Sequence, residues 1–293
     1  MESGKGSRVN AAGIEAIEVE LFVDALRRRH GYDFGNYARA SLKRRIVGIA
    51  AELGCQRISD AIPLILHDDG VLPRILSMLS VPVSEMFRDP SAFLTLRRQV
   101  VPLLQSYDRI NIWQAGCAYG EEVYSLAILL EEEGLYDRVQ IYATDINDQA
   151  LARAEEGVFP LKNMRRYADN YLKSGGRRSL TEYVHARYGF AAVDDRLKRN
   201  ISFAHHNLTA DGVFCEVNLV LCRNVLIYFN RTLQNRVFHL FHDSLARGGV
   251  LCLGRKETLV FSDLASRYEP VDAAQRIYRK IRILDDAAVP TVR

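Results

Sequence analysis

The chain has 293 residues, of which 48% are hydrophobic and 26% charged, and its formal net charge is +3. These values are ordinary for a soluble globular protein with one large domain or two modest ones, and the charge is too small to indicate nucleic acid by itself. No apolar run reaches the roughly 20 residues that a bilayer-spanning helix needs, and the first residues, MESGKGSRVN, lack the apolar core of a secretory signal.

The cysteines and histidines indicate neither disulfides nor a metal site. The five cysteines are odd in number and form no CxxC pair, which favours reduced thiols and a cytoplasmic location. His239 and His242 lie three residues apart in a predicted helix but have no further candidate ligands near them in the sequence. We therefore expect no bound metal.

The first part of the chain predicts an all-helical N-terminal domain over residues 1–82. Residues 14–29, IEAIEVELFVDALRRR, repeat apolar side chains at helical spacing, and Ile14, Ile17, Leu21 and Leu26 approximate one apolar stripe. A second helix continues to Gly54, a typical helix end, and two short helices are expected near 58–67 and 71–79.

Basic residues are concentrated in this N-terminal domain. Between positions 27 and 45 a single acid, Asp33, accompanies these cations: Arg27, Arg28, Arg29, Arg39, Lys43, Arg44 and Arg45. The segment is either a solvated helix face or a docking surface for an acidic partner, and the sequence leaves both interpretations open.

Residues 83–285 predict an α/β domain. Apolar strands are expected at 109–116, 139–146, 217–225 and 250–254, and helices at 124–134, 148–157 and 232–249, the last ending at Gly248 and Gly249. This alternation is typical of a parallel sheet covered on both faces. Residues 267–281 suggest a closing strand pair. Residues 158–200 break the alternation and are interpreted as an inserted subdomain.

A glycine loop follows the first of these strands. The segment GCAYGEE, residues 116–122, would lie at the carboxyl edge of the sheet, where doubly wound folds bind ligands. It lacks the lysine of a P-loop and the GxGxxG spacing of a dinucleotide fingerprint. Two glutamates at the start of the helix would repel a pyrophosphate, whereas the cationic S-adenosylmethionine suits them.

The second strand supports the same interpretation. YATDI places Asp145 at a strand end, 23 residues after Glu122, where a carboxylate can accept hydrogen bonds from ribose hydroxyls. Together, the loop, this acid and the absence of phosphate motifs point to a methyltransferase-type fold with S-adenosylmethionine (SAM) as its ligand.

Several blocks of the chain resemble the CheR family of chemotaxis receptor methyltransferases. They are SEMFRD at 84–89, IWQAGCAYGEEVYSLAILL at 112–130, ATDI at 143–146, Asn207 with Leu208, and LCRNVLIYF at 221–229. The resemblance runs from the helical domain to the last strands. It implies a SAM-dependent protein-glutamate O-methyltransferase with a small inserted β-subdomain, which in some members docks a receptor tail peptide.

By similarity, each matching position takes a role. Glu122 would hold the amino end of the cofactor and Asp145 its ribose, and Arg88 and Tyr228 would face the transferred methyl group as catalytic residues. The implied cofactor-binding residues are Ser84, Arg88, Gly116, Glu122, Asp145, Asn207, Leu208, Arg223 and Asn224.

The implied substrate agrees with elementary chemistry. A glutamate carboxylate is already ionised at neutral pH, with a reference pKa of about 4.3, so methylation needs orientation rather than a general base. An arginine can hold that carboxylate with two parallel hydrogen bonds. The implied partners are the cytoplasmic helices of methyl-accepting chemoreceptors or related bacterial signal-transduction proteins, with no nucleic acid, no membrane insertion and a monomeric chain.

The chain also departs from the family pattern. Pro82 stands where an asparagine is frequent, Met86 replaces a phenylalanine, and Tyr119 replaces a small hydroxyl residue beside the cofactor loop. The alternative function is therefore a regulatory module that binds SAM or S-adenosylhomocysteine (SAH) with little catalysis. A weaker third option, a methyltransferase acting on a small molecule or nucleic acid, lacks the interleaved basic and aromatic residues that nucleic acid binding favours.

Overall fold

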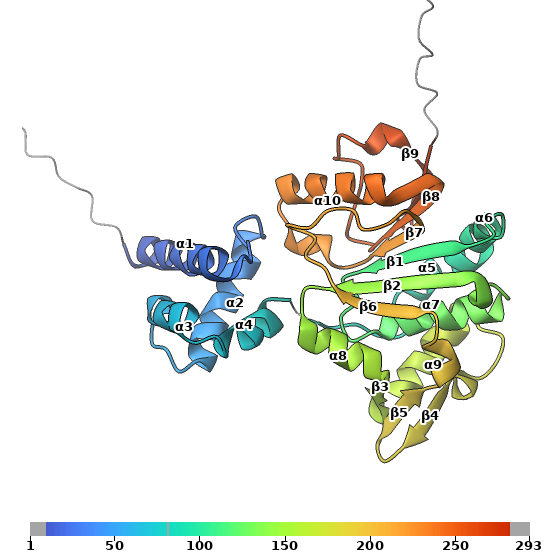
Figure 1. Cartoon of the computed structure of the whole chain (residues 1–293), viewed down its shortest axis with the longest axis horizontal. Coiled ribbons are helices and arrows are strands. Elements are labelled where there is room, and N and C mark those ends of the chain that lie inside the picture. Colours follow the sequence, from blue (N-terminus) through green and yellow to red (C-terminus); the bar gives the residue numbers. More distant parts are fainter. Residues whose placement is uncertain (1–9, 81, 282–293) are drawn as a thin grey trace, which may run out of the picture. The chain divides into compact units, whose positions relative to one another are not determined.

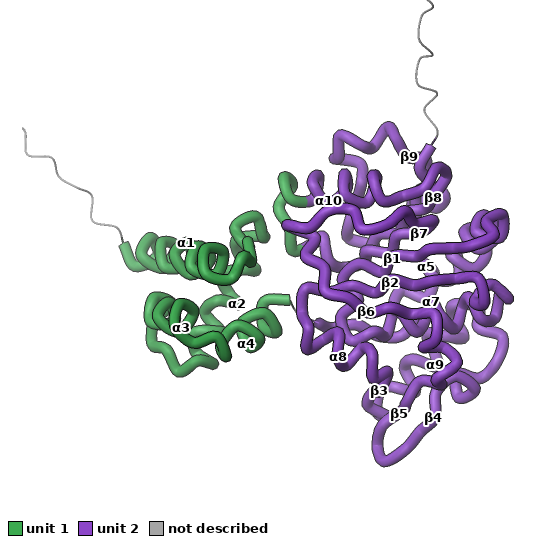
Figure 2. Tube along the Cα trace, viewed as in Figure 1, with its two compact units in different colours: residues 1–81, 228–233 green, residues 82–227, 234–293 purple. Residues whose placement is uncertain are grey.

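The chain forms two compact units. The computed structural model describes residues 10–80 and 82–281, so the segment in which we expected no secretory signal lies almost wholly outside the described residues. One unit comprises Met1–Val81 and Tyr228–Leu233, and the other Pro82–Ile227 and Gln234–Arg293 (Figure 2). Within the described ranges, every helix is too short or too polar to cross a membrane.

The first unit is helical, as the sequence predicts. Its elements are α1 (Ala11–His30), α2 (Arg39–Glu52), the 3-10 turn η1 (Ile58–Ala61), α3 (Ile62–His67) and α4 (Val71–Ser80). Asn10 begins α1 because its side chain accepts a hydrogen bond from the Gly13 N–H at 2.9 Å, which satisfies one of the free donors of the first turn.

The apolar stripe predicted for α1 is not the buried face of the helix. Ile14, Ile17 and Leu21 are 52%, 47% and 50% exposed, and the buried face consists of Phe22, Val23, Ala25 and Leu26. Helix α1 is apolar on more than one side, so the sequence period alone could not decide which side meets α3 and η1.

A segment distant in sequence completes the first unit. The Ala38 N–H donates to the Tyr228 carbonyl at 2.7 Å, and the Asn230 N–H donates to the Asn36 carbonyl at 2.8 Å. Between these two bonds, Tyr37 and Phe229 form an isolated antiparallel bridge. Residues 228–233 thus leave the α/β unit to which their neighbours in sequence belong.

The second unit is built on a seven-stranded sheet of order β6-β2-β1-β7-β8-β10-β9 (Figure 1). Its strands are β1 (Ile110–Ala115), β2 (Val139–Asp145), β6 (Ile201–His205), β7 (Val217–Cys222), β8 (Leu245–Leu253), β9 (Tyr268–Asp272) and β10 (Ile277–Lys280). The first five are parallel, and β10 runs antiparallel to β8 and β9, so the expected closing strand pair is confirmed.

Helices and short turns connect these strands. They are α5 (Pro90–Thr95), the π-helical η2 (Leu96–Val100), α6 (Val101–Leu104), α7 (Glu121–Glu132), η3 (Tyr136–Arg138), α8 (Asp148–Glu156), η7 (Leu226–Tyr228), α10 (Arg231–Ser244) and η8 (Ala265–Arg267). Successive residues of β1 point to opposite faces of the sheet. Trp113 packs edge-on against Phe241 of α10, whereas Ile112 belongs to the core cluster that contains Leu126 of α7.

Three features of this unit differ from the sequence prediction. Strand β6 and the helical stretch from α5 to α6 were not expected. Helix α10 ends at Ser244 and β8 begins at Leu245, so the residues before Gly248 are strand rather than helix. The predicted fold class is nevertheless confirmed. An all-α region precedes a Rossmann-like methyltransferase domain, and that domain contains a small inserted β-subdomain.

Residues 158–200 form the β-subdomain. It contains β3 (Val158–Pro160), η4 (Leu161–Asn163), α9 (Met164–Lys173), η5 (Leu180–Glu182), β4 (Val184–Arg187), β5 (Phe190–Val193) and η6 (Asp195–Leu197). The three strands make an antiparallel sheet of order β3-β5-β4. The side chains of Tyr171 and Tyr183 both donate hydrogen bonds to Glu132 at the end of α7, which ties the subdomain to the main sheet.

A buried ion-pair network supports that junction. Arg97 of η2 forms ion pairs with Glu132 at 2.7 Å and Glu133 at 2.6 Å, and the side chains of Arg97 and Glu132 are 5% and 2% exposed. Removing one partner of such a network leaves an uncompensated buried charge.

We therefore expect Arg97→Met to lower the free energy of unfolding by about 3 kcal/mol, measured by urea denaturation. Arg98→Met, at the exposed neighbouring position, is the matched control and should change it by less than about 0.5 kcal/mol. Equal stability of the two variants would show that the network contributes little.

Candidate functional site

The glycine loop after β1 is held at the carboxyl edge of the parallel strands. The N–H groups of Gly116 and Cys117 both donate to the Thr144 carbonyl at the end of β2, at 2.8 and 2.9 Å. Gly116 has φ = 73°, and a Cβ at this position would overlap the Val225 side chain. Only glycine fits this turn, which brings the loop against the segment that follows β7.

Asp145 lies beside this loop. Its carboxylate accepts the Ala118 N–H at 2.9 Å and the Asn147 N–H at 3.0 Å. Burial raises the pKa of Asp145, and these backbone hydrogen bonds act in the opposite direction. Each carboxylate oxygen retains acceptor capacity, so the aspartate fixes the loop and can still accept hydrogen bonds from a ligand.

Arg223 connects the central elements of the site. It follows β7, its side chain is 1% exposed, and its Nη1 and Nη2 form ion pairs with Glu122 and, at 2.8 Å, with Asp89. Nη1 also donates to the Arg88 carbonyl at 3.1 Å, and Gln114 of β1 donates to the second oxygen of Glu122 at 3.0 Å. Two predicted cofactor residues, Glu122 and Arg223, thus contact each other directly.

The SEMFRD segment forms a strained turn on this cluster. Phe87 and Asp89 have φ = 52° and 53°, which few non-glycine residues adopt. The Phe87 N–H donates to Ser125 of α7 at 2.8 Å, so the turn is fixed at two points. The Arg88 side chain is half-buried, and among residues 10–80 and 82–281 its guanidinium has no hydrogen-bond or ion-pair partner. Ser84, the first residue of the segment, is also half-buried.

Asn207 and Leu208 follow β6 at the same edge of the sheet. Both are buried, and the Asn207 side-chain oxygen accepts the N–H and hydroxyl of Thr209 at 3.0 and 2.8 Å. Strands β2 and β6 are parallel neighbours, and Asp145 at the end of β2 lies opposite His205 at the end of β6. Asn207 and Leu208 follow His205 directly, so they come close to Asp145. Their role in cofactor binding, which the family resemblance implies, stays a prediction.

The turn after β8 carries a buried carboxylate, Glu257, that the sequence did not single out. Glu257 is 4% exposed and accepts four backbone N–H groups: those of Asn224 at 3.1 Å, Gly254 at 2.6 Å, Leu226 at 2.7 Å and Ile227 at 3.3 Å. Burial raises its pKa, while these hydrogen bonds lower it. An acid after an apolar strand end, in GRKE, was the only available signal.

Several acceptor atoms at this edge have no partner within the described part of the chain. They are Gln114 Oε1, Glu121 Oε2 and Asn224 Oδ1, all buried. Unpaired acceptors next to the carboxylates of Glu122 and Asp145 fit a ligand that carries hydrogen-bond donors and positive charge. The ammonium, sulfonium and ribose hydroxyls of SAM have this chemistry.

Tyr228 belongs to the first unit rather than to this cluster. Its ring lies under the Arg45 guanidinium of α2, with 4.4 Å between the guanidinium carbon and the ring centroid. The structure therefore describes Arg88 and Tyr228, the two predicted catalytic residues, in different units, and a shared role for them stays a prediction.

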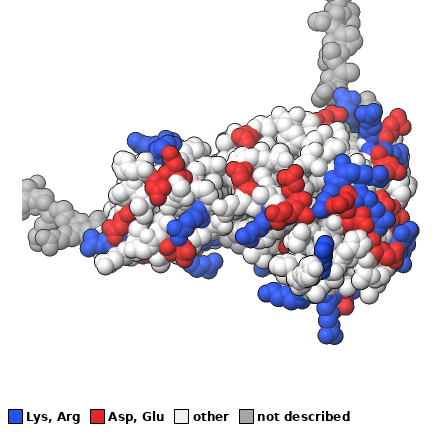
Figure 3. All heavy atoms as spheres, turned by 60° about the horizontal axis from the view of Figure 1, so that its bottom comes forward, with Lys and Arg blue, Asp and Glu red and all other residues white. Residues whose placement is uncertain are grey.

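Five of the seven cations of the basic segment pair with acidic side chains in the described part of the chain. Arg27 and Arg28 pair with Asp24, at 2.7 Å each, and Arg29 pairs with Asp69. Arg39 pairs with Glu20 at 3.6 Å, and Lys43 pairs with Glu15 at 2.6 Å. The sequence showed one acid between positions 27 and 45, but the compensating acids lie on α1 and after α3. On the face shown in Figure 3, lysine and arginine likewise lie among acidic side chains.

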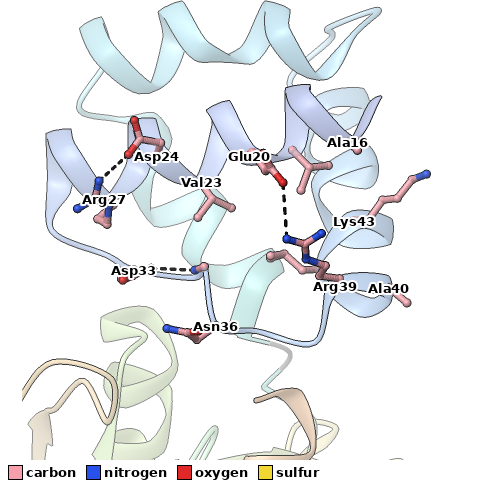
Figure 4. A pocket seen from close by; sticks show the side chains of 13 residues that line it. Ala16, Glu20, Val23, Asp24, Arg27, Asp33, Asn36, Arg39, Ala40 and Lys43 are labelled. Carbon is pink, nitrogen blue, oxygen red and sulfur yellow. Dashed lines mark hydrogen bonds and ion pairs between the residues drawn. The ribbon is translucent and has the colours of Figure 1, made fainter. Parts of the chain in front are cut away.

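A cavity of about 630 Å³ lies beside these pairs. It is lined mainly by α1, the turn at 33–36 and α2, with Val19, Val23 and Leu42 among the apolar residues (Figure 4). The Glu20–Arg39 and Asp24–Arg27 pairs lie on its wall, so its charges already have partners. None of its lining residues belongs to the sheet-edge cluster.

Comparison with known families covers most of the chain. Residues 82–276 match the family described as "CheR methyltransferase, SAM binding domain". Residues 17–80 match "CheR methyltransferase, all-alpha domain". The two matches meet near the border between the units and follow the order expected from the sequence blocks.

Three curated relatives match this chain over most of their own length. "Putative methyltransferase Cher3" of Pseudomonas putida is 50% identical over 264 residues, covering 90% of this chain and 97% of that protein. "Chemotaxis protein methyltransferase" of Listeria innocua is 29% identical, covering 82% and 89%. "Chemotaxis protein methyltransferase 1" of Pseudomonas aeruginosa is 27% identical, covering 89% and 96%.

Glu121 provides a test of the electrostatics at this edge. Burial raises its pKa above the ordinary value of 4.5, and the carboxylates of Glu122 and Glu85 add to the effect. Because its ionised form is disfavoured in the folded state, folding loses stability as pH rises through the raised pKa. Glu121→Gln should therefore melt a few degrees higher than the parent chain near neutral pH.

Well below pH 4.5 the advantage of Glu121→Gln should disappear, because the parent glutamate is then protonated in both the folded and the unfolded state. Melting temperatures measured by calorimetry across this range check the prediction. Glu155→Gln, at an exposed position of α8, is the control and should show no such pH dependence. A pH-independent difference for Glu121→Gln would contradict the assigned cause.

Proposed function

The chain belongs to the CheR methyltransferase family, and from this we propose that it methylates glutamate side chains of chemoreceptor-type signalling proteins, yielding glutamyl methyl esters and SAH. SAM is its methyl donor. Bound at the sheet edge, SAM supplies an electrophilic methyl group on a positively charged sulfur. The remaining work, binding and orientation, falls to residues of this chain.

The charge balance of the site supports binding of a cationic donor. Arg223 offsets one of the two carboxylates that it contacts, the buried Glu122 and the partly buried Asp89, so this group of three retains net negative charge. Asp145 adds a further buried carboxylate. We assign Glu122 to the amino end and Asp145 to the ribose hydroxyls, with Gly116 allowing close approach of the backbone.

The observation that carries the glutamate substrate is the state of Arg88. Arg223 holds the Arg88 carbonyl, so the backbone of the turn is fixed while the half-buried guanidinium has no partner within the described ranges. A guanidinium in this state can bind an incoming carboxylate through two parallel hydrogen bonds. We propose that Arg88 orients the acceptor glutamate, whose ionised oxygen needs no base.

The proposed partners are cytoplasmic helices of methyl-accepting receptors. The relatives from Listeria innocua and Pseudomonas aeruginosa are named chemotaxis protein methyltransferases, and those names are the support for this choice. The ion pairs of the first unit argue against the simple idea of a bare basic surface for an acidic receptor helix. We place the protein in the cytoplasm, where such receptor helices lie.

A second candidate function is a SAM- or SAH-binding regulatory module with little catalysis. One feature that favours it is Pro82, which has no backbone N–H donor. The other is Tyr119, whose ring centroid lies 5.3 Å from the guanidinium carbon of Arg153 in α8. Transfer of tritiated methyl groups to receptor-containing membranes separates the two candidates, because base-labile label forms only if the chain is an active carboxyl methyltransferase.

Cofactor binding is tested by Glu122→Gln and Asp145→Asn. Each change removes a charged acceptor, so the affinity for SAH should fall about tenfold or more in isothermal titration calorimetry. Glu155→Gln is the matched control and should bind like the parent chain. If the parent chain releases no heat on titration with SAH, the assignment of the whole site is wrong.

Substrate orientation is tested by Arg88→Ala. Because the backbone carbonyl that Arg223 holds is retained, SAH affinity should stay within about twofold of the parent value, whereas receptor methylation should fall by about a hundredfold. Arg88→Lys keeps the charge but loses the planar fork, so it should recover only part of the rate. Unchanged methylation by Arg88→Ala would remove Arg88 from the mechanism.

A further inference from the structure

A tight turn follows β8 at the edge of the sheet that carries the site. The Gly254 N–H donates to the Glu257 carboxylate at 2.6 Å, and the Glu257 N–H donates to the Gly254 carbonyl at 2.9 Å. These two bonds close the turn, and Arg255 and Lys256 form its tip. Both tip residues are exposed.

The turn is fastened to the segment after β7. Besides Gly254, the buried Glu257 carboxylate accepts the N–H groups of Asn224, Leu226 and Ile227. A Cβ added to Gly254 would lie 2.8 Å from the Asn224 nitrogen, closer than a Cβ can approach, so the two backbones touch. Arg255 therefore begins one residue away from a direct contact with Asn224, which follows the central Arg223.

The two tip cations have no acidic partners. In the described ranges neither Arg255 nor Lys256 forms an ion pair or a side-chain hydrogen bond. Asp263, an acid further along the same connection, pairs with His239 instead. By contrast, most cations of the basic N-terminal segment are compensated. The tip thus offers two uncompensated positive charges on a backbone held rigidly next to the site.

From this arrangement we propose that Arg255 and Lys256 form a recognition surface for an acidic stretch of the methyl-accepting protein, next to the glutamate that is methylated. The proposal rests on the proposed function for its partner. Exposed charges at the rim of an interface contribute to association rate, salt dependence and specificity rather than to buried packing. They would favour acceptor glutamates with other acids nearby.

The test compares two fluorescent helical peptides with SAH-loaded protein. One carries several glutamates on one face, and the other has glutamine at all but one of these positions. The parent chain should bind the glutamate-rich peptide more tightly, and added salt should weaken that preference. In the double variant Arg255→Glu/Lys256→Glu, the affinity for this peptide should fall about tenfold and the preference should vanish.

Arg109→Glu/Arg247→Glu is the matched control. These exposed arginines lie just before β1 and near the start of β8, at the opposite ends of parallel strands from the site, and the variant has the same change in net charge. It should retain the peptide preference of the parent chain. Equal loss in both variants, or no preference in the parent chain, would overturn the proposal.

Methyl transfer to the same peptides is measured separately. The recognition surface and the proposed enzyme activity are thus tested independently. Selective binding that depends on Arg255 and Lys256, without any transfer, would support the recognition surface and count against the proposed enzyme activity. Transfer that is equal for both peptides and unaffected by Arg255→Glu/Lys256→Glu would preserve the activity and overturn the recognition surface.

Discussion

The candidate site depends on one buried cation. Arg223 has almost no contact with solvent, and an isolated charge in that position would be costly, so it is stable only because Glu122 and Asp89 surround it. Those contacts join three pieces of chain: the start of α7, the SEMFRD turn and the end of β7. Compensation of this single guanidinium therefore holds the SEMFRD turn against the start of α7 and the end of β7, which the strand order already places at one edge of the sheet.

Backbone strain is concentrated around the same cation. Phe87 and Asp89 precede α5, Ala118 lies in the glycine loop and Asn224 directly follows Arg223, and all four have φ between 50° and 63°. Such conformations cost about 1 kcal/mol or more each and persist only where surrounding contacts impose them. Here three hydrogen bonds provide those contacts: from Phe87 to Ser125, from Ala118 to Asp145 and from Asn224 to Glu257. The strained backbone thus costs local stability, and it directs backbone and side-chain groups toward the ligand-binding edge of the sheet.

The local parts of the site were predictable, and the long-range parts were not. The loop from Gly116 to Glu122 and the acid Asp145 follow strands directly, so strand order alone places them at one edge. Glu257 was missed because its partners lie about thirty residues earlier, at 224–227, and no local pattern marks them. The ion pair of Arg29 with Asp69 was missed for the same reason, and the buried face of α1 depended on packing rather than on period. The family resemblance supplied residue roles that geometry alone would not assign.

The short segment Tyr228–Leu233 has a consequence for experiments that dissect the protein. Because this segment groups with the helices of the first unit, the main chain passes between the units after residue 81, after residue 227 and after residue 233. A fragment that starts at residue 82 would carry this stretch without Tyr37 and Arg45, its contacts on the deleted helices. Removal of residues 1–81 would therefore also leave residues 228–233 without their packing partners. Loss of activity in such a fragment would not by itself assign a role to the N-terminal helices.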